Sequence, residues 1–124
     1  MKSYLMLPFL ALVQPLIAEV LVPEIDQVFS AKEASGKLGQ IVVMEDIIFE
    51  IQDLGPEGPL YLNFGNTYPK ETITVVILPA LRHRFEGFEF KVGKTIRVQG
   101  EVVLRDGFPR IILREQDQII SVAE

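Results

Sequence analysis

Apolar and polar side chains alternate along several short stretches of the chain, and this spacing predicts β-strands. In residues 60–64, three apolar side chains alternate with Tyr61 and Asn63, so the two sets would lie on opposite faces of a strand. Residues 95–104 show the same alternation over a longer stretch. Residues 72–78 are rich in β-branched side chains, which favour an extended backbone. The middle of the chain therefore predicts three strands.

Two more strands are predicted on either side of this region. The apolar residues from Ile41 to Ile51 predict one long strand. The pair Glu45-Asp46 in its middle indicates a bulge or bend, which the first strand of a small barrel needs. Gly100 would permit a similar bend in the long alternating stretch. Asp106-Gly107 is a strong hairpin signal, and residues 109–114 would return from it as the fifth strand.

Two short helical segments are predicted outside the strands. Pro79 ends the third strand and suits the first position of a helix, which would cover residues 80–85 and stop at Gly87. Residues 30–33, Ser-Ala-Lys-Glu, fit a capping box and predict a helical turn that ends near Gly36. The alternative for this segment is a surface loop in which the spacing arises by chance.

The predicted order of elements is three strands, a short helix and two strands. In a chain of 124 residues this order predicts a mainly β fold, a five-stranded Greek-key β-barrel of the oligonucleotide/oligosaccharide-binding (OB) type. The one short helix lies between strands 3 and 4. Residues 116–122 would follow the barrel as a last apolar contact. An open β sandwich is the competing architecture, although it usually needs more strands and a longer chain.

The N-terminus has the pattern of a secretory signal peptide. Lys2 supplies a positive start, an apolar stretch runs to Ala18, and the first acidic residue is Glu19. The stretch is shorter than the roughly 20 apolar residues that a membrane span requires. Cleavage is expected after Ala18. Because Leu16 stands where a small residue is preferred, an uncleaved membrane anchor is the alternative.

These features divide the chain into a signal peptide at residues 1–18, a lead-in with a short helical turn at 19–35, and an OB domain at 36–124. The protein is expected to be exported, either periplasmic or secreted, with no transmembrane segment after removal of the signal. That removal takes away only Lys2 among the charged residues, so 11 basic and 17 acidic residues remain and the net charge is about −6. An acidic domain gains no general attraction to phosphate backbones.

Short motifs spread between Gly36 and Ile120 form a recognisable set. They are Leu62-Asn63-Phe64-Gly65, Tyr68-Pro69, Thr74–Ile77, Arg84-Phe85, Gly93-Lys94, Val98–Val102, Gly107–Ile111 and Gln118-Ile119. Through these motifs the chain resembles the small bacterial exported or nuclease-associated domains that are predicted to be OB-fold nucleic-acid-binding modules. The resemblance implies an OB fold and a non-catalytic module that binds single-stranded nucleic acid.

The chain departs from that group in two places. Such domains often carry an aromatic residue just after the third strand, where this chain has Leu78-Pro79. They often carry basic residues in the first strand and the following loop, where this chain has Glu45, Asp46, Asp53 and Glu57. Both departures weaken the inference of nucleic-acid binding. The alternative partner is an envelope protein, peptide or glycan.

An OB barrel normally binds its ligand on the face of strands two and three, beside the loops after strands one and four. Aromatic side chains on this face would stack on bases or sugars, and an arginine would meet a phosphate. Each residue taken alone also fits a structural role, as a half-buried barrel aromatic or as a residue that shapes a turn. The candidate ligand-binding residues are Tyr61, Asn63, Tyr68, Thr74, Phe108 and Arg110.

The sequence predicts neither a catalytic site nor a metal site. It has no cysteine and a single histidine, His83, which argues against zinc. It contains no nucleophile–base motif and no phosphate-cradling loop, so no enzyme activity and no cofactor are expected. The run Arg82–Arg84 is a local basic cluster. Solvated surface is its expected role, and it would supply phosphate contacts if nucleic acid binds.

Overall fold

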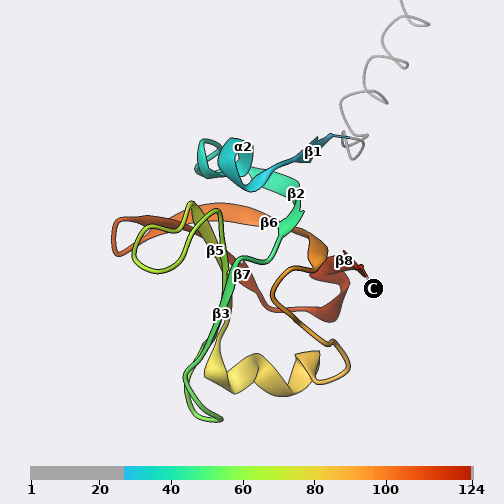
Figure 1. The fold of residues 1–124 in the computed structure, drawn as a ribbon. Helices are drawn as coiled ribbons and strands as arrows, with labels where there is room; N and C mark the ends of the chain where they lie inside the picture. The colour runs from blue at the N-terminus through green and yellow to red at the C-terminus, as the bar shows by residue number, and fades with distance from the viewer. Residues whose placement is uncertain (1–26, 124) are drawn as a thin grey trace, which may run out of the picture.

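The computed structural model describes residues 27–123, and the predicted signal peptide at residues 1–18 lies outside them. Figure 1 shows a strongly curved sheet with a small α-helix at one end and a 3-10 helix at the other. The elements are β1 (Val28–Phe29), α2 (Ala31–Ser35), β2 (Ile41–Ile47), β3 (Glu50–Asp53), β4 (Leu60–Phe64), β5 (Ile73–Ile77), the 3-10 helix η2 (Pro79–Phe85), β6 (Thr95–Arg105), β7 (Phe108–Leu113), the 3-10 turn η3 (Gln116–Gln118) and β8 (Ile119–Val122).

Eight strands form one mixed sheet in the order β1-β2-β6-β7-β5-β4-β3, and β8 pairs with β6 outside this path. The pairs β1–β2 and β5–β7 are parallel, and the other pairs in residues 27–123 are antiparallel. Although β2 and β3 are consecutive in the chain, they lie near opposite ends of this order. Residues 48–49 therefore carry the chain from one end of the sheet to the other, and the sheet curls around its core (Figure 1).

The mainly β fold is confirmed, but the predicted five-stranded barrel differs from the structure in strand number and closure. The described residues form eight strands, and the sheet is open because β1 and β3, at the two ends of the order, do not pair with each other. Two of the additional strands, β1 and β8, have two and four residues. Such strands are too short for alternation to reveal them. The third arises because the predicted first strand is divided into β2 and β3.

The division of that first strand falls at residues 48–49 and not at Glu45-Asp46, where the sequence indicated it. Both acidic residues stay within β2 because their carboxylates have partners. Glu45 accepts a hydrogen bond from Arg97 Nε at 2.7 Å, and Asp46 accepts one from the Ala31 amide at 2.8 Å. Ile48 is fully buried in the core. The strand therefore ends where an apolar side chain turns inward and not where charges interrupt the pattern.

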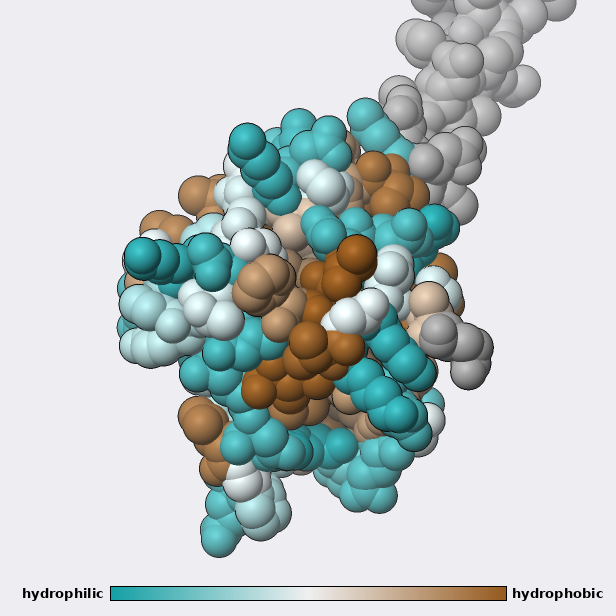
Figure 2. All heavy atoms as spheres, in the orientation of Figure 1, coloured by the Kyte–Doolittle hydropathy of each residue, from teal (hydrophilic) through white to brown (hydrophobic). Residues whose placement is uncertain are grey.

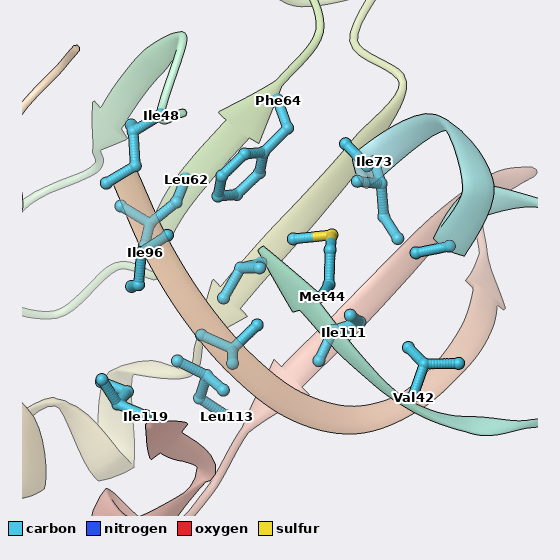
Figure 3. Close-up of a cluster of buried hydrophobic side chains, with 14 of the residues drawn as sticks. Val42, Met44, Ile48, Leu62, Phe64, Ile73, Ile96, Ile111, Leu113 and Ile119 are labelled. Carbon is cyan, nitrogen blue, oxygen red and sulfur yellow. The ribbon is translucent and has the colours of Figure 1, made fainter. Parts of the chain in front are cut away.

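The core lies inside the curve of the sheet, and Phe64 and Met44 are among its largest side chains (Figure 3). The predicted alternation on β4 is confirmed, since Leu62 and Phe64 belong to the core. Packing requires the glycine in the middle of β6, because a Cβ at Gly100 would lie 2.7 Å from Ile111 Cγ2. Burial of apolar surface is the main favourable contribution to folding. The inner face of the sheet is thus occupied by the core, and the outer face remains accessible to a ligand.

Both predicted helical segments are present. In the capping box of α2, Glu33 Oε1 accepts from the Ser30 amide at 2.9 Å and Ser30 Oγ accepts from the Glu33 amide at 3.2 Å. Hydrogen bonding of the Glu33 carboxyl to the Ser30 backbone amide, and secondarily to the Ser30 side chain, holds its pKa below the ordinary value. Ala31 and Ala34 are buried in the core, so α2 packs against the sheet. The helix predicted after the third strand begins at Pro79 as expected, and it is a 3-10 helix.

Candidate ligand-binding face

The outer face of β3, β4, β5 and β7 carries a row of polar side chains. The strand register places Glu50 opposite Asn63, Asn63 opposite Thr74, and Thr74 beside Arg110. Residues that are partners on paired strands point to the same side of a sheet. These four side chains therefore cross four strands on the face that is turned away from the core. We refer to Glu50, Asn63, Thr74 and Arg110 as the polar row.

Hydrogen bonds join three members of the polar row. Asn63 Nδ2 donates to Glu50 Oε1 at 2.7 Å and to Gln52 Oε1 at 2.9 Å. Thr74 Oγ1 donates to Asn63 Oδ1 at 2.8 Å. Asn63 is 0% exposed and Thr74 is 2% exposed, so these bonds supply the partners that buried polar groups need. Asn63 and Thr74 therefore form a rigid floor whose hydrogen-bonding groups are already used within the protein.

The loop between β4 and β5 is fastened over this floor. Glu50 Oε1 accepts a second hydrogen bond from the Tyr68 amide at 2.9 Å, and the Thr72 amide donates to the Phe64 carbonyl at 2.8 Å. Gly65 begins the loop with a φ of +88°, and a Cβ there would collide with the Thr72 side chain. The turn therefore requires glycine. Tyr68 is left 59% exposed, so the loop presents an accessible aromatic side chain.

A cavity of about 270 Å³, which we call the face pocket, lies where the polar row meets this loop. The structure brings five of the six predicted site residues together around it. The sixth, Phe108, lies at the start of β7 and is not among the lining residues. The pocket is lined by Gln52, Leu54, Tyr61, Asn63, Tyr68, Glu71, Thr74 and Arg110.

Sequence reasoning missed three of the lining residues, Gln52, Leu54 and Glu71. Gln52 has a detectable signal, because it flanks the half-buried Ile51 on β3 and alternation therefore assigns it to the outer face. Leu54 and Glu71 belong to loops, where neither helical nor strand periodicity applies. Only the path of the loop over the sheet brings Glu71 to the pocket.

Arg110 and Tyr61 pack against each other in the face pocket. The guanidinium carbon of Arg110 lies 5.2 Å from the centre of the Tyr61 ring, which is within the range of a cation–π interaction. Part of the Tyr61 ring is thus already covered by a protein group. Within residues 27–123, two buried side-chain atoms lack a hydrogen-bond partner, Arg110 Nε and Glu71 Oε1. Both belong to this pocket, so it contains one unused donor and one unused acceptor.

The predicted basic cluster on η2 is occupied by contacts within the protein. Arg82 donates to the two carboxylate oxygens of Asp53 at 2.8 and 3.0 Å and to the Gly55 carbonyl at 2.6 Å. The hydrogen bond from Arg82 holds the pKa of Asp53 below its ordinary value, and the same bond raises the pKa of Arg82. Arg84 donates to Glu115 at 2.7 Å. These two arginines connect η2 to other segments and do not form one free cationic patch.

A second cavity of about 480 Å³, which we call the end pocket, lies beside η2. Three phenylalanines, Phe85, Phe88 and Phe90, contribute to its wall. The ring centres of Phe85 and Phe88 are 6.3 Å apart, and those of Phe88 and Phe90 are 6.2 Å apart. Arg82 also lines this pocket, where it fastens the loop after β3. The end pocket is thus aromatic, whereas the face pocket is lined mostly by polar side chains.

Within residues 27–123, no group of three or more His, Cys, Asp or Glu side chains is placed to hold a metal ion. In the same range, no helix combines the length and the apolar character that crossing a membrane requires.

No protein-family model and no curated protein matches this chain. Among solved structures, the chain is similar to OBody AM2EP06 bound to hen egg-white lysozyme, with a TM-score of 0.53 and 13% identity over 83% of this chain and 94% of that one. It is also similar to a "putative nucleic acid-binding lipoprotein" from Klebsiella pneumoniae, with a TM-score of 0.46 and 15% identity over 81% of this chain and 100% of that one. At such identities the likeness concerns the fold alone, and the OBody has the higher score of these two.

Proposed function

We propose that this protein is an exported, non-catalytic binding module with an OB-type fold. The strand order supports the fold type when β2 and β3 are counted as the two halves of one bent strand. The sheet order β2-β6-β7-β5-β4-β3 then reads, in terms of the five predicted strands, as first, fourth, fifth, third, second and again first. An OB fold is a five-stranded, partly open Greek-key barrel. The likeness to the OBody is a second support for this fold type.

The face pocket is the observation that carries the proposed function. It lies on the outer face of β4 and β5, the second and third strands in this numbering. In OB folds this face binds oligonucleotides and oligosaccharides. Its floor is rigid because Asn63 bonds to neighbours on both sides, and a rigid floor loses little entropy when a ligand binds. The exposed ring of Tyr68 supplies an apolar surface at its edge.

Charge favours a neutral polar ligand over a phosphate backbone. A groove for single-stranded nucleic acid combines aromatic platforms with a row of cations. The face pocket instead contains one carboxylate, Glu71, and one cation, Arg110, and the polar row ends in a second carboxylate, Glu50. The expected exported chain carries a net charge of about −6, which opposes an approaching polyanion. We therefore propose an uncharged envelope glycan as the ligand, with its hydroxyl groups in the pocket and its apolar ring face on Tyr68.

Single-stranded nucleic acid is the second candidate ligand, and one observation favours it. Tyr61, Tyr68 and Arg110 line the same pocket, so a base stacked on a tyrosine would bring its phosphate close to a guanidinium group. Binding of this kind weakens steeply as salt is added, because it depends on the release of counterions. Binding of a neutral glycan has no such dependence. Salt therefore distinguishes the two ligands.

The non-catalytic part of the proposal rests on the side chains of the face pocket. The residues that line it include no serine, cysteine or histidine, so they do not offer a Ser–His or Cys–His pair for nucleophilic catalysis. Glycoside hydrolysis would need two carboxyl groups on either side of the bond, one of them protonated. Glu50 Oε1 already accepts hydrogen bonds from Asn63 Nδ2 and from the Tyr68 amide, so this oxygen is occupied by contacts within the protein. We expect a bound glycan to be recovered intact after prolonged incubation.

A calorimetric titration of the purified protein tests the proposal. The ligands are soluble β-1,4-linked sugar oligomers and, separately, an unstructured single-stranded oligonucleotide, each at low and at moderate salt. We expect glycan binding that is insensitive to salt and that Tyr68→Ala weakens. Phe108→Ala is the matched control, because this aromatic residue lies outside the pocket. Salt-sensitive binding of the oligonucleotide without glycan binding would establish the second candidate and reject the first.

A further inference from the structure

The two unpartnered atoms of the face pocket define what a ligand must offer there. Glu71 Oε1 can only accept a hydrogen bond when the carboxyl is ionised, and Arg110 Nε can only donate one. Leaving such buried groups without partners destabilises the protein. They do not satisfy each other, since none of the ion pairs among residues 27–123 joins Glu71 to Arg110. Both atoms are buried, so a ligand reaches them when the Glu71 and Arg110 side chains turn toward the pocket that they line. A ligand group that donates at one atom and accepts at the other would then satisfy both.

The charges around the two atoms narrow the choice of that group. A carboxylate or phosphate would pair with Arg110 but would be repelled by Glu71, which lines the same pocket. An ammonium group would pair with Glu71 but would be repelled by Arg110. A neutral group avoids both costs. A secondary amide is neutral and carries its N–H donor and its carbonyl acceptor on separate atoms of one rigid plane.

The size and the apolar parts of the pocket point to a small amide on a ring. The cavity of about 270 Å³ is smaller than the roughly 300–1,000 Å³ of sites for drug-sized ligands, so it holds one small unit. Leu54 lines it and is 56% exposed, which leaves apolar surface for a methyl group. Tyr68 offers a ring against which the C–H face of a sugar can pack. These features match a pyranose that bears an acetamido group.

We infer that the face pocket recognises an N-acetylated amino sugar through its acetamido group. The amide N–H donates to Glu71 Oε1, the carbonyl oxygen accepts from Arg110 Nε, and the methyl group contacts Leu54. This inference rests on the proposed function, since it names the sugar within the glycan. The inference gives Glu71 and Arg110 a shared role in binding. Neither side chain belongs to the core or takes part in the hydrogen bonds of the polar row.

Two trisaccharides that differ at a single position test this inference. Tri-N-acetylchitotriose and cellotriose share the β-1,4 backbone, and the acetamido groups of the first are hydroxyl groups in the second. Because hydrogen bonds to charged groups are involved, we expect tri-N-acetylchitotriose to bind at least about tenfold more tightly. Glu71→Ala and Arg110→Met should each abolish this preference. Glu57→Ala and Arg105→Met are the matched controls, since both positions are exposed and outside the pocket.

Each outcome bears on a different part of the inference. Equal binding of the two trisaccharides would reject the acetamido group and leave the proposed glycan-binding function intact. Chitotriose, the deacetylated form of the first sugar, is titrated as a third ligand. If it binds more tightly than tri-N-acetylchitotriose, Glu71 recognises an ammonium group and the inferred acetamido contact is rejected. Binding of neither sugar would reject the proposed function itself. Thermal unfolding of every variant is measured in parallel, so that a loss of binding in a folded protein is attributed to the pocket.

Discussion

Two arginines in two pockets have opposite surroundings. Arg82, at the end pocket, donates hydrogen bonds to both oxygens of Asp53 and to the carbonyls of Gly55 and Gly58. Arg110, in the face pocket, lies over the Tyr61 ring, and its buried Nε atom has no hydrogen-bond partner within residues 27–123. The first arginine is used to join η2 to the loop after β3. The second keeps a buried donor unused.

This difference separates a structural role from a binding role. A side chain that donates several hydrogen bonds within the protein, as Arg82 does, contributes to the free energy of folding, and a ligand gains little by competing for it. A buried donor without a partner lowers stability until something binds, as strained or unsatisfied groups at functional sites do. Substitution of the two arginines should therefore affect different properties. The predictions below test this division, beginning with the largest change in stability.

Asn63→Ala should cause the largest loss of stability. Although Asn63 lines the face pocket, its side chain makes three hydrogen bonds within the protein, so its role is structural. Its loss removes one hydrogen-bond partner each from Glu50, Gln52 and Thr74. We expect a decrease of about 2–3 kcal/mol in the free energy of unfolding. Urea denaturation measures it, with the exposed Asn66→Ala as the control, for which we expect less than about 0.5 kcal/mol. Equal effects at the two positions would refute the rigid floor.

Arg82→Met should lower stability and leave ligand binding unchanged. The variant keeps an apolar stem but loses the bonds to Asp53 and to the loop carbonyls. Since Asp53 is half exposed, with 54% of its side-chain surface accessible, we expect a modest decrease in the free energy of unfolding, smaller than that of Asn63→Ala. The measurements are urea denaturation and a titration with tri-N-acetylchitotriose. A variant with native stability and impaired binding would reverse the division of roles.

Arg110→Met should show the opposite pattern. The substitution removes a buried donor without a protein partner, which stabilises the fold, and it removes the cation–π contact with Tyr61, which destabilises it. Because the two effects oppose each other, we expect the free energy of unfolding to change by less than about 0.5 kcal/mol. Binding should fall about tenfold, because a charge-assisted hydrogen bond to the ligand is lost. The same two measurements apply. A loss of stability as large as that of Arg82→Met would place Arg110 among the structural residues.

The smallest expected effect concerns acid stability. Arg82 holds the pKa of Asp53 below the ordinary value of 3.8, so ionised Asp53 stabilises the folded state at a pH above that value. This contribution is lost as the pH falls through the lowered pKa of the folded protein. The stability difference between the native protein and Arg82→Met should therefore be constant near neutral pH and shrink below about pH 3.8. Urea denaturation over a pH series provides the test. Arg110→Met is the control, because the stability difference between this variant and the native protein does not depend on the ionisation of Asp53.

The alternation of apolar and polar residues predicted those strands in which several successive alternate side chains point into the core. Residues 60–64 and 95–104 were assigned correctly because each alternation is anchored by buried side chains such as Leu62 and Val98. The division of the first strand was misplaced, because charged residues inside a strand resemble an interruption until their partners are known. Arg97, the partner of Glu45, is far away in the chain. Pairing between distant segments is the information that a local pattern lacks.

The same reasoning explains which pocket residues could be anticipated. Tyr61 and Thr74 lie on regular strands, so alternation assigns them to the outer face. Glu71 reaches the pocket only through a loop that depends on Gly65 and on the bond between Glu50 and Tyr68. Phe108 was proposed as an aromatic residue of the ligand face and its flanking loops, but the residues that line the pocket do not include it. Alternation therefore predicts the pocket residues that lie on strands. Among the loop residues, Tyr68 could be proposed because it is aromatic, whereas Leu54 and Glu71 required the structure.

Amide and side-chain NMR shifts of the isotope-labelled protein, followed during a titration with tri-N-acetylchitotriose, test the central claim most directly. The account predicts that the changes concentrate at Tyr61, Tyr68, Glu71 and Arg110 on the outer face. Figure 2 shows apolar patches on one face of the molecule, and exposed apolar residues such as Ile41 and Val92 do not line the face pocket, so non-specific contacts have other places to occur. Changes centred on Phe88 and Phe90 in the end pocket, or an absence of saturable changes, would contradict the claim that the outer face of β4 and β5 is the binding site.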